Sequence, residues 1–309
     1  MRIFDGAAHV PKHFGPSAVS IGKFDGVHLG HRAVISHLRA IAERDHLQAV
    51  AVTFDRNPLA LLAPEKCPES LVSVPQKLRL LATTGVDAAL VLHFDRELAA
   101  LPPEVFVRRI LVDSLEARAV LVGADFRFGH RGAGDVALLT ELGTQLGFRV
   151  EVVDDVRPAG DRRVSSTWIR ELLAEGDVRR AAELLGHTPT VRGLVVHGAA
   201  RGRELGFPTA NLSPESEGLI PADGVYAGWL TDGGVRYPAA ISVGDNPTFA
   251  GVPKKQVEAY VLDRDLDLYD HVVDVEFVER IRGQVAFTSI DELIVQMRRD
   301  VDDVRGFVH

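Results

Sequence analysis

A glycine-rich segment near the start of the chain carries two closely spaced histidines. Residues 22–31 read GKFDGVHLGH and directly follow a short apolar run. Glycines let the backbone approach a ligand, and the first turn of a helix offers free N–H groups and a dipole that favour phosphate. His28 and His31 can both donate hydrogen bonds to phosphate oxygens as charge develops during an in-line transfer. The segment therefore predicts a triphosphate site for nucleotidyl transfer.

Each part of this pattern also has a simpler explanation. Two histidines three residues apart are common on helix surfaces, and a glycine-rich turn alone is a weak signal. A metal site at His28 and His31 lacks a third ligand nearby, whereas protein zinc sites use three or four. The combination of the glycines and both histidines after an apolar run favours a phosphate-binding site.

A second segment has the composition of an anion-binding helix start. Residues 164–170 read VSSTWIR. Ser165 and Ser166 are good N-cap residues, and the hydroxyl and N–H groups at a helix start can hold phosphate. Arg170, one turn later, adds positive charge. Taken alone, a plain N-cap would explain the serines better.

A third segment combines glycines, arginines and oxygen-bearing side chains. Residues 197–211 read HGAARGRELGFPTAN. The glycines and arginines favour a loop that wraps phosphates. Thr209 and Asn211 project to the same side of an extended stretch, so both oxygens can reach one hard cation, and Mg²⁺ bridging nucleotide phosphates is the natural choice. The alternative is a solvated basic loop.

The composition limits the classes of protein. The chain has 309 residues, room for two ordinary domains, with 35 basic and 43 acidic side chains and a net charge of −8, which argues against a nucleic-acid partner. Cys67 is the single cysteine, which excludes an internal disulfide and a cysteine-based zinc site. No apolar run approaches the ~20 residues that span a bilayer, and the first residues lack a signal-peptide pattern. We therefore expect a soluble cytoplasmic protein without membrane contact.

The first part of the chain alternates short apolar runs with helical patterns. The predicted strands are 18–21, 49–54, 88–92, 119–122 and 150–153, and the predicted helices are 31–45, 76–82, 103–111 and 136–146. This alternation predicts a Rossmann-like α/β domain, a parallel sheet with helices on both faces. Ligands in that architecture bind beyond the carboxyl ends of the strands, where the loops after Ile21, Phe54 and Val122 converge.

After two further helical segments, the pattern changes to short strands with Gly/Pro turns. The helices are 165–173 and 177–185, and the strands are 191–196, 225–230, 237–243, 257–262 and 272–278. This spacing predicts a small antiparallel β-barrel. A C-terminal helix follows, with a capping-box spacing at Ser289 and Glu292 and an apolar stripe of Ile290, Leu293, Met297 and Val301. We place the domains at 1–186 and 187–309.

Several of these motifs together resemble a known enzyme family. The HLGH run at 28–31 and the SSTWIR run at 165–170 resemble the two signatures of the nucleotidyltransferase superfamily. More narrowly, residues 22–28, the GADFRFG run at 123–129 and residues 164–167 resemble prokaryotic bifunctional FAD synthetases. That family combines riboflavin kinase with FMN adenylyltransferase. The resemblance covers nearly the whole chain.

The resemblance implies adenylyl transfer in the first domain. The AMP part of ATP would join FMN to give FAD, and pyrophosphate would leave. His28 and His31 would stabilise the α-phosphate. The β- and γ-phosphates would be held by Ser166, Thr167 and Arg170. The other ATP or phosphate contacts that the resemblance implies are Gly22, Phe24, Asp25, Gly26, Gly30, Asp125, Arg163 and Ser165.

In the second domain, the PTAN run at 208–211 resembles the motif of riboflavin kinases. The resemblance gives Glu258 the role of a base that takes the proton from the ribityl 5′-hydroxyl as it attacks the γ-phosphate, a contribution on the order of 10²–10⁴ in rate. Mg²⁺ would accompany ATP, held by Thr209 and Asn211. The other ATP or flavin contacts that the resemblance implies are Gly198, Arg201, Gly202, Arg203, Gly206, Pro208, Tyr226, Asn246 and Arg282. The implied small molecules are riboflavin, FMN, FAD, ATP, ADP and pyrophosphate.

The chain departs from the family pattern at one point. Where the family usually carries Pro-His-Pro, this chain has Arg56-Asn57-Pro58. A role carried by that histidine does not transfer to Asn57. One alternative is therefore a riboflavin kinase whose first domain is a degenerate nucleotide binder. Two others are a flavin-binding module without catalysis and a nucleotidyltransferase for another substrate.

Overall fold

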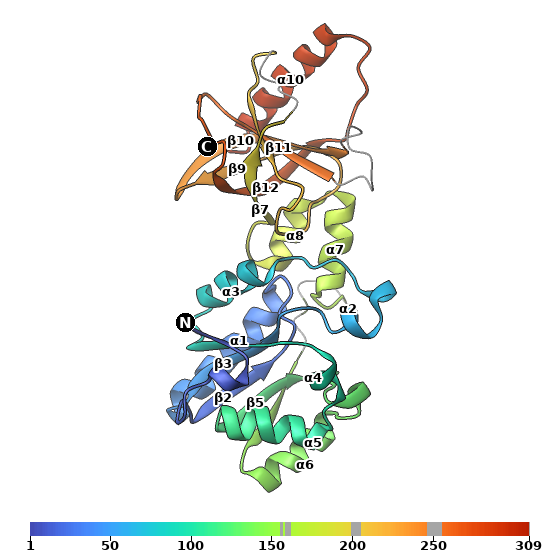
Figure 1. Cartoon of the computed structure of the whole chain (residues 1–309). Helices are drawn as coiled ribbons and strands as arrows, with labels where there is room; N and C mark the ends of the chain where they lie inside the picture. Colours follow the sequence, from blue (N-terminus) through green and yellow to red (C-terminus); the bar gives the residue numbers. More distant parts are fainter. Residues whose placement is uncertain (155–156, 158–161, 199–204, 246–254, 309) are drawn as a thin grey trace. The chain divides into compact units, whose positions relative to one another are not determined.

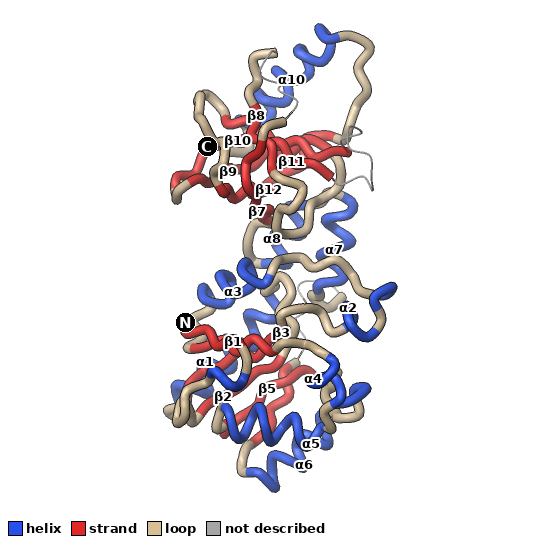
Figure 2. Tube along the Cα trace, in the orientation of Figure 1, coloured by secondary structure: helices blue, strands red, loops and turns tan. Residues whose placement is uncertain are grey.

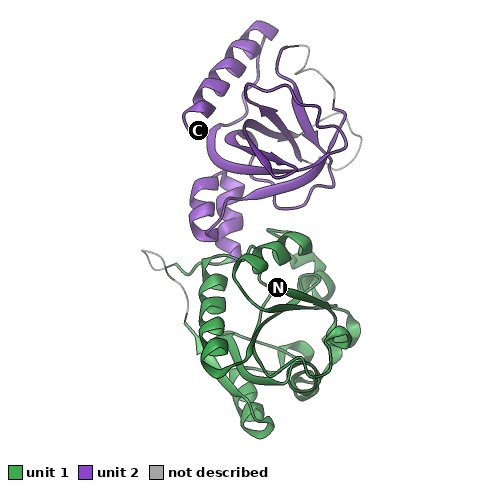
Figure 3. Ribbon diagram, turned by 90° about the vertical axis from the view of Figure 1, so that its left-hand side faces the viewer, with its two compact units in different colours: residues 1–165 green, residues 166–309 purple. Residues whose placement is uncertain are grey.

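The chain folds into two compact units. In the computed structural model, the described residues are 1–154, 157, 162–198, 205–245 and 255–308. The units are residues 1–165 and residues 166–309, green and purple in Figure 3. The first contains a parallel sheet and the second a closed antiparallel barrel, so the predicted fold class is confirmed.

Unit 1 is built on a six-stranded sheet. Its strands are β1 (Arg2–Asp5), β2 (Ser17–Ile21), β3 (Gln48–Phe54), β4 (Ala88–Leu92), β5 (Ala117–Gly123) and β6 (Arg149–Val153). They lie in the order β1-β4-β3-β2-β5-β6, and all neighbours are parallel. Every residue of β2 and β4 is buried, as expected for strands covered on both faces. Because β2 and β3 are parallel neighbours, the loops that follow them leave the same edge of the sheet.

Helices cover both faces of this sheet (Figure 1). The helices of unit 1 are α1 (Leu29–Asp45), α2 (Leu59–Leu62), α3 (Val74–Thr83), α4 (Arg96–Ala100), α5 (Pro103–Phe106), the π-helical η3 (Val107–Ser114) and α6 (Val136–Leu146), with short 3-10 turns η1 (Ala7–His9), η2 (Pro64–Lys66) and η4 (His130–Gly132). α1 and α3 bury Leu38 and Leu81 against one face. η3 and α6 bury Leu111 and Leu139 against the other. The sheet is thus fixed between two apolar layers.

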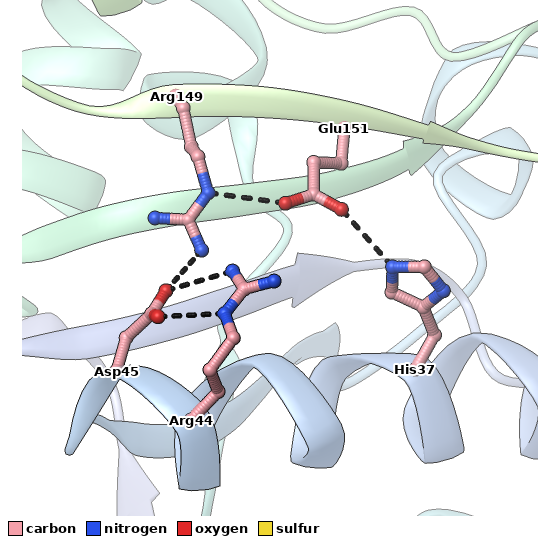
Figure 4. Close-up of polar contacts among 5 residues, drawn as sticks. All are labelled: His37, Arg44, Asp45, Arg149 and Glu151. Atoms are coloured by element: carbon pink, nitrogen blue, oxygen red, sulfur yellow. Dashed lines mark hydrogen bonds and ion pairs between the residues drawn. The ribbon is translucent and has the colours of Figure 1, made fainter.

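A network of charged side chains joins α1 to the edge strand β6 (Figure 4). Arg149 contacts Asp45, and its Nε donates to Glu151 at 3.0 Å. His37 lies 3.0 Å from the other Glu151 oxygen, and Arg44 pairs with Asp45 through two hydrogen bonds. Exposed ion pairs contribute about 0–1 kcal/mol each. The apolar contacts of α1, rather than this network, hold the helix on the sheet.

Unit 2 begins with two helices and continues into the barrel (Figure 2). Its elements are α7 (Ser166–Glu175), α8 (Val178–Leu185), β7 (Thr190–Val196), β8 (Thr209–Leu212), β9 (Gly224–Asp232), β10 (Val235–Asp245), β11 (Lys255–Val261), β12 (Val272–Arg282) and α10 (Ile290–Arg305). The barrel order is β10-β11-β8-β7-β12-β9, and β9 closes it by pairing with β10. Closure leaves no open sheet edge.

The C-terminal helix covers one side of the barrel with its second half. Val301 and Val304 of α10 pack with Ala227 and Leu262. The predicted apolar stripe is wrong at its start, because Ile290 is 65% exposed. Full burial begins about three turns later, at Asp300, since the first turns of α10 lie beyond that packed cluster.

Two strands were not predicted from the sequence. β1 has four residues, too few for a periodic pattern, and it pairs only with β4. β8 lies inside the segment that was predicted as a phosphate loop, and its pairing with β7 and β11 makes it part of the barrel. Among the described helices, none combines the length and hydropathy needed to cross a bilayer.

Candidate active sites

The loop between β2 and α1 carries the predicted transferase residues. Phe24, Gly26 and Val27 have φ values of 48°, 81° and 42°. Positive φ is strained for a β-branched residue such as Val27, and such strain persists where the surrounding structure fixes it, often at functional sites. The side chains of Phe24 and Val27 are 2% and 0% exposed. The loop is therefore held in a strained form by its buried apolar side chains.

His28 is the N-cap of α1, and this role fixes its ring. Its Nδ1 accepts a hydrogen bond from the backbone N–H of His31 at 3.4 Å. An accepting Nδ1 leaves the proton of the neutral ring on Nε2, where it can be donated to a ligand. The two rings stack with centroids 3.7 Å apart. Within the described residues, the buried Nδ1 of His31 has no hydrogen-bond partner.

Both histidines are neutral near pH 7. Burial, followed by the nearby charge of Arg163, lowers the pKa of His28 to about 4. Burial also holds the pKa of His31 well below its usual range, with neighbouring positive charges adding to the effect. Preorganised neutral donors of this kind can stabilise negative charge that develops on a phosphate. Arg163 supplies fixed positive charge beside them.

The lowered pKa of His28 predicts acid-sensitive stability. Between about pH 6.5 and 4 the unfolded chain binds a proton that the folded protein does not, so the free energy of unfolding falls as pH falls. At 1.36 kcal/mol per pKa unit, His28 alone accounts for about 3 kcal/mol of this loss. Urea denaturation at pH 7 and pH 4.5 measures it. His28→Asn keeps a good N-cap but does not titrate, so its stability should fall less; an equal fall would contradict the assignment.

The other predicted residues of this loop have local packing and hydrogen-bonding roles. A Cβ added to Gly30 would lie 3.1 Å from the His28 ring, so the absence of a side chain there matters. Asp25 Oδ1 accepts from the backbone N–H of Leu71 at 2.9 Å and so fastens the loop to the segment before α3. Gly22 and Gly26 complete the loop, with Gly22 lying against the Phe24 ring.

The remaining predicted transferase residues divide between the two units. Asp125 follows β5, and its carboxylate accepts from Arg163 at 3.1 Å. Ser165 ends unit 1, whereas Ser166, Thr167 and Arg170 are on α7 of unit 2. Their contact with the phosphates stays a prediction.

Asn57, where the chain departs from the family pattern, has a local structural role. Its Oδ1 accepts from the backbone N–H of Leu59 at 3.1 Å, and its carbonyl accepts from the N–H of Ala60 at 2.9 Å. These bonds begin helix α2. The Asn57 side chain is therefore engaged in the turn.

In unit 2, the barrel register brings the predicted kinase residues together. Asn211 of β8 is directly opposite Glu258 of β11, so their side chains share one face of the sheet. The Thr209 hydroxyl donates to Glu258 at 3.4 Å, and Gln256 donates from Nε2 to Asn211 Oδ1 at 3.2 Å. Burial raises the pKa of Glu258, which the Thr209 hydrogen bond partly offsets. A raised pKa suits a carboxylate that must accept a proton.

Gly198 approaches Asn211 so closely that a side chain would displace it. A Cβ at Gly198 would lie 2.5 Å from Asn211 Cγ, and Asn211 is only 7% exposed. We expect Gly198→Ala to lower kcat/KM of the step catalysed by unit 2 on the order of ten- to a hundredfold, because displaced groups catalyse poorly. Steady-state kinetics of that step measure the effect. Gly283→Ala is the matched control, since its Cβ would lie no closer than 3.7 Å to a neighbour; equal losses in both variants would contradict the prediction.

A small pocket with polar and apolar walls adjoins Thr209. Its lining residues are Val195, Pro208, Thr209, Ala210, Ala259, Val261, Arg264, Leu266, Leu268 and Tyr269. The Tyr269 ring lies 3.9 Å from the His197 ring, centroid to centroid. Gly206, before Pro208, has a φ of 87°, a conformation that favours glycine.

Two predicted kinase residues are engaged elsewhere. Tyr226 is 0% exposed inside the barrel, packs edge-to-face on Phe277 and donates its hydroxyl hydrogen to the Ala222 carbonyl. Arg282 donates to both carboxylate oxygens of Asp300 on α10, at 2.9 and 2.7 Å. These contacts place Tyr226 in the barrel core and Arg282 in an ion pair. They direct neither side chain toward a ligand. Arg201, Gly202, Arg203 and Asn246 lie outside the described residues.

Sequence reasoning missed Gln256 and Lys77. Gln256 stands two residues before Glu258 on the same strand, so the period of two already places both on one face. Lys77 is a buried lysine of α3 that donates to the Phe54 carbonyl at 2.8 Å. A single lysine in a helical pattern gives no such signal.

The oxygen-bearing side chains of unit 2 fit a magnesium ion that arrives with ATP. In the part of the chain that the structure describes, no three His, Cys, Asp or Glu side chains form a cluster that could hold a metal alone. Mg²⁺ usually takes one or two protein oxygens and keeps water and phosphate as its other ligands. Thr209, Asn211 and Glu258 offer hard oxygen atoms on one face. This donor set matches such an ion.

A strained loop with two histidines on a parallel sheet and a polar cluster on a closed barrel fit a two-unit transferase that uses nucleotides. The family models divide the chain in the same way: FAD synthetase matches residues 10–168 and riboflavin kinase matches residues 185–308. The chain belongs to the family of bifunctional riboflavin kinase/FMN adenylyltransferases.

Known relatives match over almost their full length. The bifunctional riboflavin kinase/FMN adenylyltransferase of Escherichia coli K12 is 39% identical, with 94% of this chain and 92% of the relative covered. The enzyme of the same description from Listeria monocytogenes is 35% identical, with 94% and 91% covered. A crystal structure described as a macrolide-efflux protein from Streptococcus pneumoniae has a TM-score of 0.87 and 30% identity, covering 99% of this chain and 98% of that one.

Proposed function

We propose that the chain makes both flavin cofactors in sequence. Unit 2 phosphorylates riboflavin to FMN with ATP, and unit 1 joins the AMP part of a second ATP to FMN to give FAD. The observation that carries this proposal is the presence of two different polar constellations on two folds, each matched by its own family model. We propose a functional boundary between residues 186 and 187, which assigns α7 and α8 to the transferase part of the chain although they lie within unit 2 of the fold.

The kinase step uses the Glu258 cluster. The ribityl 5′-hydroxyl oxygen attacks the γ-phosphorus, its proton passes to the Glu258 carboxylate, and the bond from the γ-phosphorus to ADP breaks. The Thr209 hydroxyl orients the carboxylate through its hydrogen bond. Mg²⁺, when bound with ATP beside Thr209 and Asn211, neutralises charge on the phosphates.

The adenylyl-transfer step uses the histidine pair. A phosphate oxygen of FMN attacks the α-phosphorus of ATP, and the bond to pyrophosphate breaks. The nucleophile is already an anion, so no general base is required. His28 and His31 donate hydrogen bonds to the α-phosphate as charge develops there, which their neutral state allows. Arg163 supplies further positive charge beside His28.

The alternatives are less well supported. A kinase with a degenerate first domain is not favoured, because the FAD synthetase model matches unit 1. A binding module without catalysis has no use for the buried Glu258, whose pKa burial raises. A nucleotidyltransferase for another substrate does not explain the riboflavin kinase match. We further propose a cytoplasmic enzyme whose partners are its small-molecule substrates and products.

A product assay tests the proposal. The protein is incubated with riboflavin, ATP and Mg²⁺, and the flavins are separated by chromatography over time. FMN should form first and FAD second. Formation of FMN without FAD, even when FMN is supplied, would support the kinase-only alternative, and no flavin product at all would contradict both activities.

A further inference from the structure

Lys77 is a buried cation beside the proposed transferase site. It is 8% exposed, and its Nζ donates to the carbonyl oxygen of Phe54 at 2.8 Å and to that of Lys23 at 3.3 Å. Lysine is almost never fully buried unless it is paired. Here the hydrogen bonds run to backbone oxygens of two separate chain segments.

These two carbonyls belong to neighbouring strand ends. Lys23 lies in the loop between β2 and α1, which carries both histidines, and Phe54 is the last residue of β3. The Lys23 carbonyl also accepts from the Thr53 hydroxyl at 3.1 Å. β2 and β3 are adjacent and parallel, and ligands of such sheets bind beyond these carboxyl ends. Lys77 thus links the two chain segments that border the proposed site.

The charge of Lys77 is maintained against its burial. Burial lowers its pKa to about 8, and the carboxylates of Asp25 and Asp55 oppose that shift. Its charge also contributes to the low pKa of His31, as does the charge of Lys23. The titratable groups coupled to Lys77 are therefore Asp25 from the loop, His31 from α1 and Asp55, which follows β3. The burial of this charge opposes folding, and the two backbone hydrogen bonds and the two carboxylates offset that cost.

We propose that Lys77 is a positioning residue for adenylyl transfer, whose ammonium group holds the loop carrying His28 and His31 against the end of β3. The inference rests on the proposed function of unit 1. Lys77 acts through the Lys23 and Phe54 carbonyls rather than by contact with the reacting phosphate. Its loss should disturb the alignment of the histidines more than the binding of ATP.

The test replaces Lys77 with methionine in the full chain. For Lys77→Met we expect kcat of FMN-to-FAD conversion to fall tenfold or more, because small displacements of catalytic groups cost on the order of a hundredfold. KM for ATP should change less than kcat. Riboflavin phosphorylation by the same sample should stay at the wild-type rate, and the melting temperature should be unchanged or higher. Lys66→Met, which removes an exposed lysine of unit 1, should leave all four quantities unchanged.

Charge and pH provide a second readout. Wild-type adenylyl transfer should fall as pH rises through about 8, where Lys77 loses its proton, and Lys77→Met should lack this alkaline limb. Lys77→Arg keeps a charged donor at every pH tested, so it should recover part of the lost rate and carry activity to higher pH.

Three results would decide against the inference. In the first, Lys77→Met converts FMN to FAD at the wild-type rate. In the second, the variant loses both half-reactions equally and its melting temperature falls. In the third, the alkaline limb of the pH profile persists in Lys77→Met. Failure of the wild-type protein to form FAD from FMN would instead overturn the proposed function of unit 1. The two failures are therefore distinguishable in one set of assays.

Discussion

Replacing His31 with alanine is expected to slow FMN-to-FAD conversion on the order of 10²–10³-fold, while riboflavin phosphorylation continues at the wild-type rate. The His31 ring is buried, stacks on His28, and carries a nitrogen with no hydrogen-bond partner among the described residues. We expect a phosphate oxygen of the bound nucleotide to become the partner of that nitrogen. Removing one preorganised donor affects the transition state more than the bound substrate, so kcat should fall more than KM rises.

His37→Ala is the matched control for this substitution. His37 lies on the same helix, but on the surface, where it contacts Glu151 (Figure 4). It should leave both half-reactions unchanged. Both are measured by chromatography of flavins, starting once from riboflavin and once from FMN. If folded His31→Ala lost both half-reactions equally, the assignment of separate sites would be wrong.

Replacing Glu258 with glutamine is expected to have the opposite effect. FMN formation should slow on the order of 10²–10⁴-fold, because the amide cannot take the proton from the attacking hydroxyl. The amide retains the size of the carboxylate and can still accept the Thr209 hydrogen bond, so the barrel should fold normally. Conversion of supplied FMN to FAD should continue at the wild-type rate.

The pH profile separates a base from a structural carboxylate at this position. Burial raises the pKa of Glu258, so wild-type kinase activity should decline as pH falls through that raised value, when the base becomes protonated. Glu258→Gln should show a low rate without that acidic limb. Glu215→Gln, an exposed position of unit 2, is the control for loss of one carboxylate. A kinase rate in Glu258→Gln equal to that of the wild type would contradict the role of Glu258.

Much of the architecture could be predicted from local patterns. Alternating strands and helices predicted the parallel sheet of unit 1, because strands covered on both faces are apolar throughout. Short strands with turns predicted the barrel. β1 and β8 could not be predicted this way, since four residues show no clear period and their identity depends on pairing with distant strands. Tertiary contacts likewise determine which half of α10 packs on the barrel.

The site residues show the same distinction between features set by local pattern and features set by tertiary contact. The positions of His28 and His31 follow from their spacing at a helix start, and a period of two places Thr209 and Asn211 on one side of a strand. The pairing of Asn211 with Glu258 depends on the barrel register, which no local pattern reveals. The link made by Lys77 between two strand ends also depends on the packing of α3.

The most direct test of the two-site account follows the phosphates of ATP into the products. The full chain is given riboflavin, Mg²⁺ and ATP labelled either at the α- or at the γ-phosphate, and label is measured in purified FMN and FAD. The account predicts that FMN carries only γ-label, whereas FAD carries label from both positions. Absence of α-label from FAD, or its presence in FMN, would contradict cleavage of ATP at different phosphorus atoms in the two units.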